Sequence, residues 1–309
     1  MSKLLTVFGA TGNQGRSVIN TVLADPILSQ EYKIRGITRD TSKPDAKALA
    51  DKGVEVVSAD TSSPSSLSQA LSGSTSVFLV TNPSFTENSD AEFQQGKAVV
   101  DAAKEVGVEH LIFSSLLNVI DSTGGRLKNV PHFDQKAQVE QYIRDLGIPA
   151  TFVLPGYFMS NYVSMGLIRK GDDGVYTLAY PVNEGSKFPL VDIEGDFGKY
   201  VGSALKNPTK TQGVQILAAS DYYTPTRILS EFEEVTGHKT RFVQIDYETY
   251  KSFMPGYLGL EMLENHLFIE EPGYFLGRSL KESQELVADA GFKLTSWKEF
   301  LEKNKGVFA

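Results

Sequence analysis

A glycine-rich segment near the start of the chain constrains the fold more than any other feature. Residues 9–15 read Gly-Ala-Thr-Gly-Asn-Gln-Gly, after the apolar run 4–8 and before a helical pattern that begins near Gln14. Three glycines at a spacing of three between a strand and a helix are typical of a turn that holds a dinucleotide pyrophosphate. A plain turn is the alternative, but the buried-type strand before it favours a nicotinamide dinucleotide as the ligand.

Composition narrows the classes of protein. The 309 residues are enough for a full Rossmann domain and a smaller lobe, and 41% hydrophobic with 22% charged residues is an ordinary soluble composition. The net charge of −8 and the lack of a Lys/Arg block argue against direct nucleic acid binding. With no cysteine and no ligand spacing among the four histidines, we expect no disulfide and no metal site.

Nothing in the sequence indicates a membrane or a secretory route. The chain enters its first strand without a basic and then apolar leader, and no apolar run approaches the ~20 residues of a membrane span. We therefore expect a cytoplasmic protein, with the nucleus as a second location.

The first half of the chain alternates short apolar strands with helical stretches. This alternation predicts a Rossmann-type, doubly wound α/β fold with a parallel sheet and helices on both faces. Ser63-Pro64 marks the start of a helix over 65–71. The predicted strands are 4–8, 33–38, 54–58, 76–80, 110–114 and 150–154.

Beyond about residue 155 the regular alternation stops. We predict a dinucleotide-binding domain over 1–155 and a smaller, mainly C-terminal α/β lobe over 156–309, made discontinuous by a return of about 188–220 to the sheet. Segment 156–190 reads as loops with short elements, and 247–309 as mainly helical with a capping box at Ser296 and Glu299. The remaining predicted elements are a helix over 193–205, a strand over 214–218, a helix over 225–236 and a strand over 241–245.

The end of the second strand bears on the choice between NADP and NAD. An acid there would accept hydrogen bonds from the ribose hydroxyls and repel a 2′-phosphate. This chain has Thr38 at that position, with Arg39 and Lys43 nearby to engage a phosphate. NADP(H) is therefore preferred, while Asp40 leaves NAD(H) as an alternative and a solvated basic loop as the plain interpretation.

Polar residues that follow the third and fourth strands extend this edge. Asp60 and Thr61 can meet the adenine, and Thr81, Asn82 and Pro83 would lie beside the nicotinamide half. A plain turn is the alternative for Asn82-Pro83.

Candidate catalytic residues lie at the start of a helix. Short-chain reductases pair a tyrosine acid with a lysine four residues later, and here His132 and Lys136 stand in those positions. Lys136 is placed to hold the nicotinamide ribose, and an imidazole can donate a proton. A structural histidine is the alternative, because the usual acid is missing.

Aromatic residues follow the sixth strand. Pro155-Gly156-Tyr157-Phe158 would pass near the nicotinamide. Its aromatic rings, with Tyr162, can line a cleft or pack the interface between the lobes, and both interpretations stay open.

These residues together resemble the NmrA-like family, atypical members of the short-chain dehydrogenase/reductase superfamily. The likeness covers nearly the whole chain and resembles the NADPH-sensor branch more than the plant isoflavone-reductase branch. The segments that carry it are Gly9–Gly15, Thr38-Arg39, Thr81-Asn82, Gln95-Gly96-Lys97, Gly125-Arg126-Leu127, His132–Lys136, Pro155–Phe158 and 294–306.

The resemblance implies a site that holds NADP(H). It assigns the pyrophosphate to the glycine turn and the 2′-phosphate to Arg39 through Lys43. Gln94 is a departure, because sensor-like members can carry lysine there. The implied cofactor-binding residues are Gly9, Thr11, Gly12, Asn13, Gln14, Gly15, Arg39, Lys43, Asp60, Thr61, Thr81, Asn82, Pro83, Gln94, Lys136, Pro155, Tyr157, Phe158 and Met159.

Two functions follow from this resemblance. The first is a redox sensor that reports the NADP(H) ratio through a regulatory protein partner, such as a transcription factor, or through its own dimerisation. The second is an NADPH-dependent reductase of a quinone, enone or carbonyl compound held in the cleft. The missing tyrosine acid favours the sensor, and the family also contains true reductases, so both hypotheses are kept.

Overall fold

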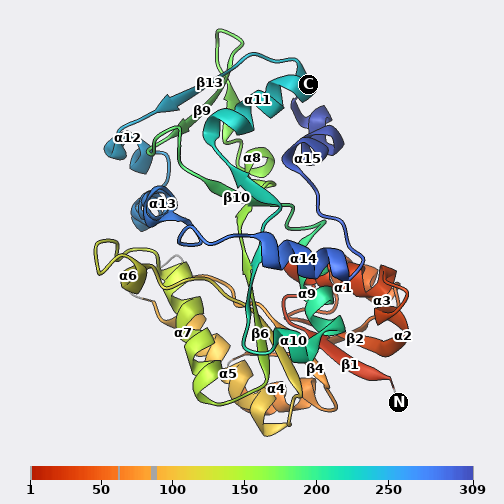
Figure 1. The fold of residues 1–309 in the computed structure, drawn as a ribbon. Helices are drawn as coiled ribbons and strands as arrows, with labels where there is room; N and C mark the ends of the chain where they lie inside the picture. The colour runs from red at the N-terminus through yellow and green to blue at the C-terminus, as the bar shows by residue number, and fades with distance from the viewer. Residues whose placement is uncertain (1, 62, 85–88, 309) are drawn as a thin grey trace.

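A seven-stranded sheet forms the centre of the molecule, which is described here by a computed structural model covering residues 2–61, 63–84 and 89–308 (Figure 1). The strand order is β11-β6-β5-β4-β1-β2-β3, and every neighbouring pair is parallel. All carboxyl ends therefore meet at one edge. The strands are β1 (Lys3–Val7), β2 (Tyr32–Thr38), β3 (Glu55–Ser58), β4 (Ser76–Leu79), β5 (His110–Ser114), β6 (Ala150–Pro155) and β11 (Gln215–Ala218).

Helices cover both faces of this sheet. Successive strand residues point to opposite faces, so Val77 and Leu79 of β4 join one hydrophobic core and Phe78 joins the other. Helices α4 (Pro64–Leu71), α5 (Ala91–Glu105) and α7 (Pro131–Asp145) cover the first core, and α1 (Asn13–Ala24) and α9 (Phe197–Lys206) the second. Shorter helices complete the two layers: α2 (Leu28–Glu31), α3 (Pro44–Ala50), α6 (Val119–Ser122), α10 (Pro208–Thr211) and α14 (Lys281–Asp289).

A smaller lobe is stacked on the carboxyl edge of the sheet, with the C-terminus in this lobe and the N-terminus at the opposite end (Figure 1). It contains two three-stranded sheets, β12-β10-β7 and β13-β9-β8. Their strands are β7 (Tyr157–Phe158), β8 (Ile168–Lys170), β9 (Tyr176–Tyr180), β10 (Phe188–Val191), β12 (Asp221–Tyr223) and β13 (Thr240–Gln244). The helices are α8 (Asn161–Ser164), α11 (Pro225–Thr236), α12 (Tyr247–Ser252), α13 (Tyr257–Phe268), α15 (Trp297–Asn304), the π-helix η1 (Ile269–Gly273) and the 3-10 helix η2 (Lys305–Phe308).

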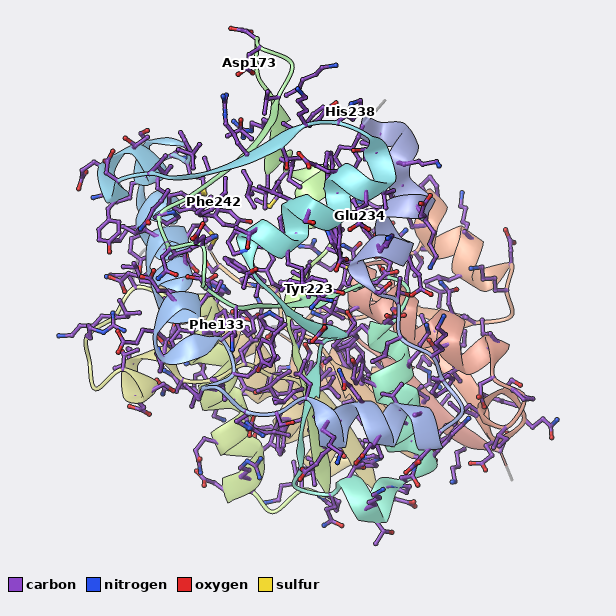
Figure 2. The ribbon with its side chains drawn as sticks, turned by 45° about the horizontal axis from the view of Figure 1, so that its top comes forward. Phe133, Asp173, Tyr223, Glu234, His238 and Phe242 are labelled. Atoms are coloured by element: carbon purple, nitrogen blue, oxygen red, sulfur yellow. The ribbon has the colours of Figure 1, made fainter. Side chains whose placement is uncertain are left out.

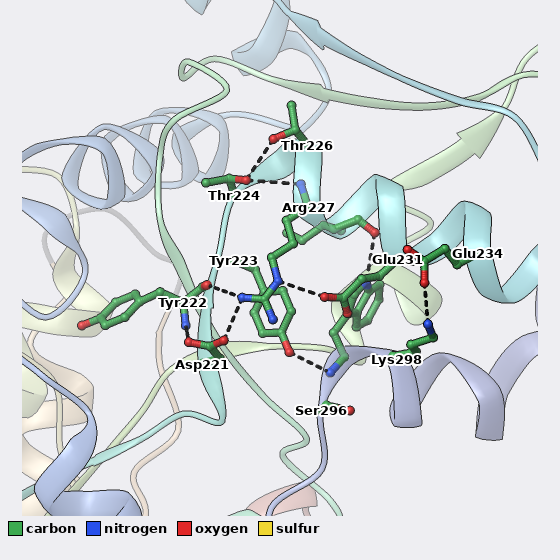
Figure 3. Close-up of polar contacts among 12 residues, drawn as sticks. Asp221, Tyr222, Tyr223, Thr224, Thr226, Arg227, Glu231, Glu234, Ser296 and Lys298 are labelled. Carbon is green, nitrogen blue, oxygen red and sulfur yellow. Dashed lines mark hydrogen bonds and ion pairs between the residues drawn. The ribbon is translucent and has the colours of Figure 1, made fainter.

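The last helix is anchored to this lobe through β12 and α11. The Trp297 backbone N–H donates to the Tyr223 phenol at 3.1 Å, and the Trp297 indole N–H donates to the Ile228 carbonyl at 3.0 Å. Arg227 lies 4.0 Å from the centre of the Tyr223 ring and pairs with Asp221 and Glu231 (Figure 3). This buried aromatic anchor ties the C-terminal segment to the lobe.

The structure confirms the predicted fold class. The six strands expected in the first half are present, each end within one residue of its predicted position, and the Ser296–Glu299 capping box is formed. The helix expected over 193–205 begins later, at Phe197, because Asp192 accepts the backbone N–H of Gly195 and so forms a turn. Segment 156–190, read as loops with short elements, holds strands β7 to β10 and α8.

The described part of the chain contains no helix with the length and apolarity that a bilayer crossing requires. The sequence predicts that residues of about 188–220 return to the large sheet. Within this segment, β11 joins the large sheet beside β6, whereas β10 pairs with β7 and β12 in the smaller lobe. The division into two domains stays a prediction.

The contact between α9 and α1 yields a test of the packing. A Cβ added at Gly198 would lie 2.1 Å from the Ser17 carbonyl oxygen, so the two backbones would have to separate. We expect Gly198→Ala to lower the free energy of unfolding by about 2 kcal/mol, measured by urea denaturation. Gly306→Ala is the control, because no atom lies within 4 Å of its added Cβ. Equal stability of the two variants would contradict the packing.

Candidate coenzyme and substrate cleft

The glycine turn between β1 and α1 forms a cradle with space for a phosphate. Gly9 has a φ of +65°, which L side chains rarely adopt, and its carbonyl accepts the Gly12 N–H at 2.9 Å. A Cβ on Gly15 would lie 2.1 Å from the Gly9 carbonyl oxygen, so only glycine permits this approach of helix to strand. Gly12 caps α1 without a side-chain hydrogen bond, which leaves the positive end of the helix dipole to a ligand.

A second observation at this turn supports the fit to a dinucleotide. The Gln14 side-chain oxygen is buried and has no hydrogen-bond partner among the described residues. An orphaned polar atom beside an uncapped helix N-terminus indicates a missing polar ligand. The residues present therefore fit a pyrophosphate group.

The cradle opens into a cleft of about 1110 Å³ between the large sheet and the smaller lobe. Thirteen of the predicted site residues line it, which brings both candidate catalytic side chains and the glycine turn into one cavity. They are Gly9, Gly12, Asn13, Gln14, Gly15, Thr81, Asn82, Pro83, His132, Lys136, Pro155, Tyr157 and Phe158.

The residues assigned to the adenosine half lie outside this cleft, on the same edge of the sheet. Arg39 and Lys43 are exposed just beyond the carboxyl end of β2, and Asp60 and Thr61 follow β3. Because β2 and β3 continue the sheet from β1, these residues extend the edge that begins at the cradle. Their assignment stays a prediction.

The acidic residue in the loop after β2, Asp40, is engaged by hydrogen bonds within the loop. Asp40 accepts hydrogen bonds from the Ser42 hydroxyl at 2.6 Å and the Ser42 N–H at 2.9 Å. These bonds lower the pKa of the Asp40 carboxyl, so it stays ionised at neutral pH. No described residue pairs with the Arg39 guanidinium, which leaves it available to an anion.

Three other residues that the sequence assigns to the coenzyme do not line the cleft. Gln94 is exposed on α5 and donates to Asp90 at 3.0 Å. Met159 is fully buried in the hydrophobic core, and its N–H donates to the Val191 carbonyl at 3.0 Å. Thr11 is half-buried in the glycine turn. In the described structure these side chains do not reach the cavity.

Lys136 is held by a buried ion pair at the end of β4. Its ammonium group donates to Glu92, to the Thr81 hydroxyl at 3.0 Å and to the Thr81 carbonyl at 3.2 Å. Burial lowers the pKa of Lys136, and the Glu92 carboxylate opposes that shift. An ammonium has three N–H donors, so all of them have acceptors within the protein. Lys136 thereby fixes the strand end that lies beside the cleft.

His132 is held by a carboxylate from the other lobe. Its Nδ1 contacts Glu261 of α13, which is fully buried. Because a carboxylate only accepts, Nδ1 is the donor in this contact. The pair joins the first turn of α7 to α13 across the cleft and fixes the orientation of the imidazole.

The far end of the cleft is aromatic. Tyr157, Tyr180 and Tyr250 line it together with His266, whose ring centre lies 4.7 Å from that of Tyr180. Burial raises the pKa of Tyr157 to about 12 and lowers the pKa of His266 to about 4. At neutral pH this compartment is therefore uncharged, with phenols that remain protonated.

Several of these residues are absent from the sequence predictions. The sequence contained a signal for Glu92, because this acid falls on the apolar stripe of α5 with Gly96, Val99 and Val100. An acid at such a position needs a buried partner. Glu261 and His266 of α13 carried none, since α13 has no clear amphipathic pattern and Glu261 contacts His132 across more than a hundred residues. Of the aromatic lining, Tyr157 was among the predicted residues, whereas Tyr180 and Tyr250 were not.

The described residues contain no group of three or more His, Cys, Asp or Glu that could hold a metal ion.

Fold and site together define a Rossmann-type α/β protein with a cradle shaped for a dinucleotide. The model of the NmrA-like family matches residues 1–301, and the chain belongs to this family.

Relatives and solved structures agree with this membership. The NmrA-like family domain-containing oxidoreductase ptmS of Penicillium ochrochloron is 33% identical over 300 residues, covering 91% of this chain and 88% of the relative. NmrA, a negative transcriptional regulator solved with NADP, has a TM-score of 0.80 at 21% identity, covering 98% of this chain and 95% of that one; it was also solved with NAD. The triphenylmethane reductase of Citrobacter sp., solved with NADP(H), has a TM-score of 0.79 at 23% identity. The match covers 98% of this chain and 99% of the reductase.

The Lys136–Glu92 pair yields a stability test. Removing one partner of a buried pair leaves an uncompensated charge, which costs about 3–5 kcal/mol, whereas an apolar replacement of both avoids that cost. We expect Glu92→Leu to be strongly destabilised in urea unfolding and the Glu92→Leu/Lys136→Met double variant to recover most of the loss. A double variant that is no more stable than the single one would contradict the pairing.

Proposed function

We propose that this protein is an NADP(H)-dependent oxidoreductase that reduces a hydrophobic, conjugated substrate such as a quinone, an enone or a carbonyl compound. The observation that carries the proposal is the continuity of the cavity. One cleft runs from the glycine cradle to the compartment of Tyr157, Tyr180 and Tyr250. Its volume of about 1110 Å³ slightly exceeds the ~300–1,000 Å³ of ordinary ligand pockets. It therefore offers room for a second molecule beside the nicotinamide half.

The preference for NADP(H) over NAD(H) is supported by the end of β2. Thr38 replaces the acid that would repel a 2′-phosphate, Arg39 is exposed and pairs with no described residue, and Asp40 is occupied by Ser42. A guanidinium binds a phosphate through two parallel hydrogen bonds. NAD(H) remains the alternative, and the related fold of NmrA was solved with each coenzyme.

In the proposed reduction, different residues of the chain would bind the coenzyme, position it and supply the proton. The coenzyme supplies a hydride when bound. Gly12 through Gly15 would hold its pyrophosphate, and Lys136 would keep Thr81 and the end of β4 in place beside the nicotinamide half. His132, oriented by Glu261, would donate its Nε2 proton to the reduced substrate when both ring nitrogens are protonated. The aromatic compartment would exclude water from the reacting atoms.

The redox-sensor hypothesis stays a prediction beside this one. A solved structure described as that of a negative transcriptional regulator shares the fold, at 21% identity. A partner protein and a homodimer rest on the resemblance alone, and a nuclear location stays an expectation from the sequence. Curated relatives with 28 to 34% identity are named oxidoreductases, which together with the size and lining of the cleft supports the reductase.

Coenzyme choice gives the first test. We expect Arg39→Ala to weaken NADPH binding about tenfold and to leave NADH binding unchanged, because only NADPH carries the 2′-phosphate. Titration of coenzyme fluorescence measures both affinities. Lys239→Ala, which removes an exposed cation in the outer part of the smaller lobe, should change neither (Figure 2 marks the adjacent His238). Equal affinity of the wild type for both coenzymes would refute the preference.

Turnover gives the second test. With a panel of quinones and enones, we expect steady NADPH oxidation, and His132→Ala should lower kcat by about 10²-fold or more while leaving NADPH affinity intact. His238→Gln is the matched control, since its imidazole lies at the outer end of the lobe (Figure 2). An intact kcat in His132→Ala would exclude the assigned acid. No turnover on any substrate, together with coenzyme-dependent self-association, would favour the sensor.

A further inference from the structure

The hairpin of β8 and β9 carries a cation, Arg169, on the face that lines the cleft. In this antiparallel pair Arg169 stands directly opposite Thr177, so both side chains project from the same face of the sheet. Thr177 and its neighbour Ala179 line the cleft, and so does Arg169. The alternate residues Tyr176 and Leu178 are buried in the core behind the sheet. The register therefore places the Arg169 guanidinium on the cleft side.

The next residue faces the other way. Lys170 stands opposite Tyr176, and its ammonium group lies 5.8 Å from the centre of that buried ring. Lys170 also borders the cleft, but its charge is directed to the core side of the hairpin. The chain thus supplies two adjacent exposed cations on opposite faces of one strand.

The charge of Arg169 is not compensated within the described structure. Arg241, which stands opposite Thr177 on β13, pairs with Asp173 at 2.8 Å and donates to the Thr177 hydroxyl at 3.0 Å. The Arg169 Nε donates to the Gly166 carbonyl at 2.8 Å, and no described carboxylate pairs with its terminal nitrogens. The residues that line the cleft, as far as the chain is described, include no aspartate or glutamate.

These observations point to the charge of the substrate. A guanidinium presents a rigid fork of donors that matches a carboxylate in a bidentate arrangement. The rest of this half of the cleft is aromatic or apolar, with Tyr180, Phe253, Met254 and Met262 among its lining residues. Such a lining accepts a flat conjugated body, and its flexible methionines adapt to the body's shape.

We propose that Arg169 is a specificity-determining residue that binds a carboxylate substituent of an aromatic or conjugated substrate. This inference rests on the proposed function, since it concerns the substrate half of the same cleft. The carboxylate lies at the end of the substrate away from the coenzyme, because the β8–β9 hairpin belongs to the outer part of the smaller lobe, with Asp173 at its tip (Figure 2). The cleft accordingly selects anionic over uncharged molecules of the same shape.

The test uses two probes of nearly identical shape, anthracene-2-carboxylate and anthracene-2-carboxamide. Binding is measured by calorimetry in 20 mM salt, without coenzyme and again with saturating NADP⁺. We expect the wild type to bind the carboxylate about tenfold more tightly, and Arg169→Ala to bind the two probes within about twofold. Arg169→Lys should keep part of the preference, because it retains the charge without the fork. High salt should reduce the preference in the wild type.

Lys170→Ala is the matched control and should retain the full preference. The inference is overturned if the wild type binds both probes equally or binds neither at millimolar concentration, or if Arg169→Ala keeps the preference. It is also overturned if Arg169→Ala weakens NADPH binding, because the cation would then serve the coenzyme. A preference for the carboxylate without any NADPH binding would instead refute the proposed function alone.

Discussion

The parallel direction of all seven strands in the large sheet is the constraint on which the site depends. Parallel pairing brings the carboxyl ends of strands that are distant in the chain to one edge. The glycine turn after β1, Thr81 after β4 and Pro155 at the end of β6 meet there, although about 70 residues separate each from the next. The smaller lobe covers the same edge, so one cleft lies between the sheet and the lobe.

Buried charges then shape what this cleft can do. Burying an ion is costly unless a partner is present, and Glu92 and Glu261 supply partners to the candidate catalytic side chains Lys136 and His132. Glu92 and Thr81 accept the hydrogen bonds of Lys136, so its ammonium group is tied to the strand end beside the cleft. The aromatic half stays uncharged, and no carboxylate in the described part of the chain pairs with Arg169 on the hairpin. The cleft therefore combines an uncharged aromatic compartment with a cation near its rim.

The strands and helices of the first half followed from local patterns. Short apolar runs separated by helical stretches marked β1 to β6, and Ser63-Pro64 and, near the C-terminal end, Ser296 marked helix starts through capping chemistry. Segment 156–190 was harder to interpret, because β7 to β10 are short and pair with partners far along the chain, such as β13 with β9. Short strands of this kind are stabilised by pairing with distant strands, and a local sequence pattern gives no information about those pairing partners.

The sequence alone determined the fold class, the cradle at Gly9–Gly15 and the placement of His132 and Lys136 at the start of one helix. These depend on steric rules within a few residues: a positive φ at Gly9, the close approach at Gly15 and the 3.6-residue period. Only the tertiary structure decided that Glu92 neutralises Lys136, that Glu261 holds His132, and that Arg169 faces the cleft while Lys170 does not. Those outcomes depend on desolvation and on the register between distant elements, and both exist only after the chain has folded.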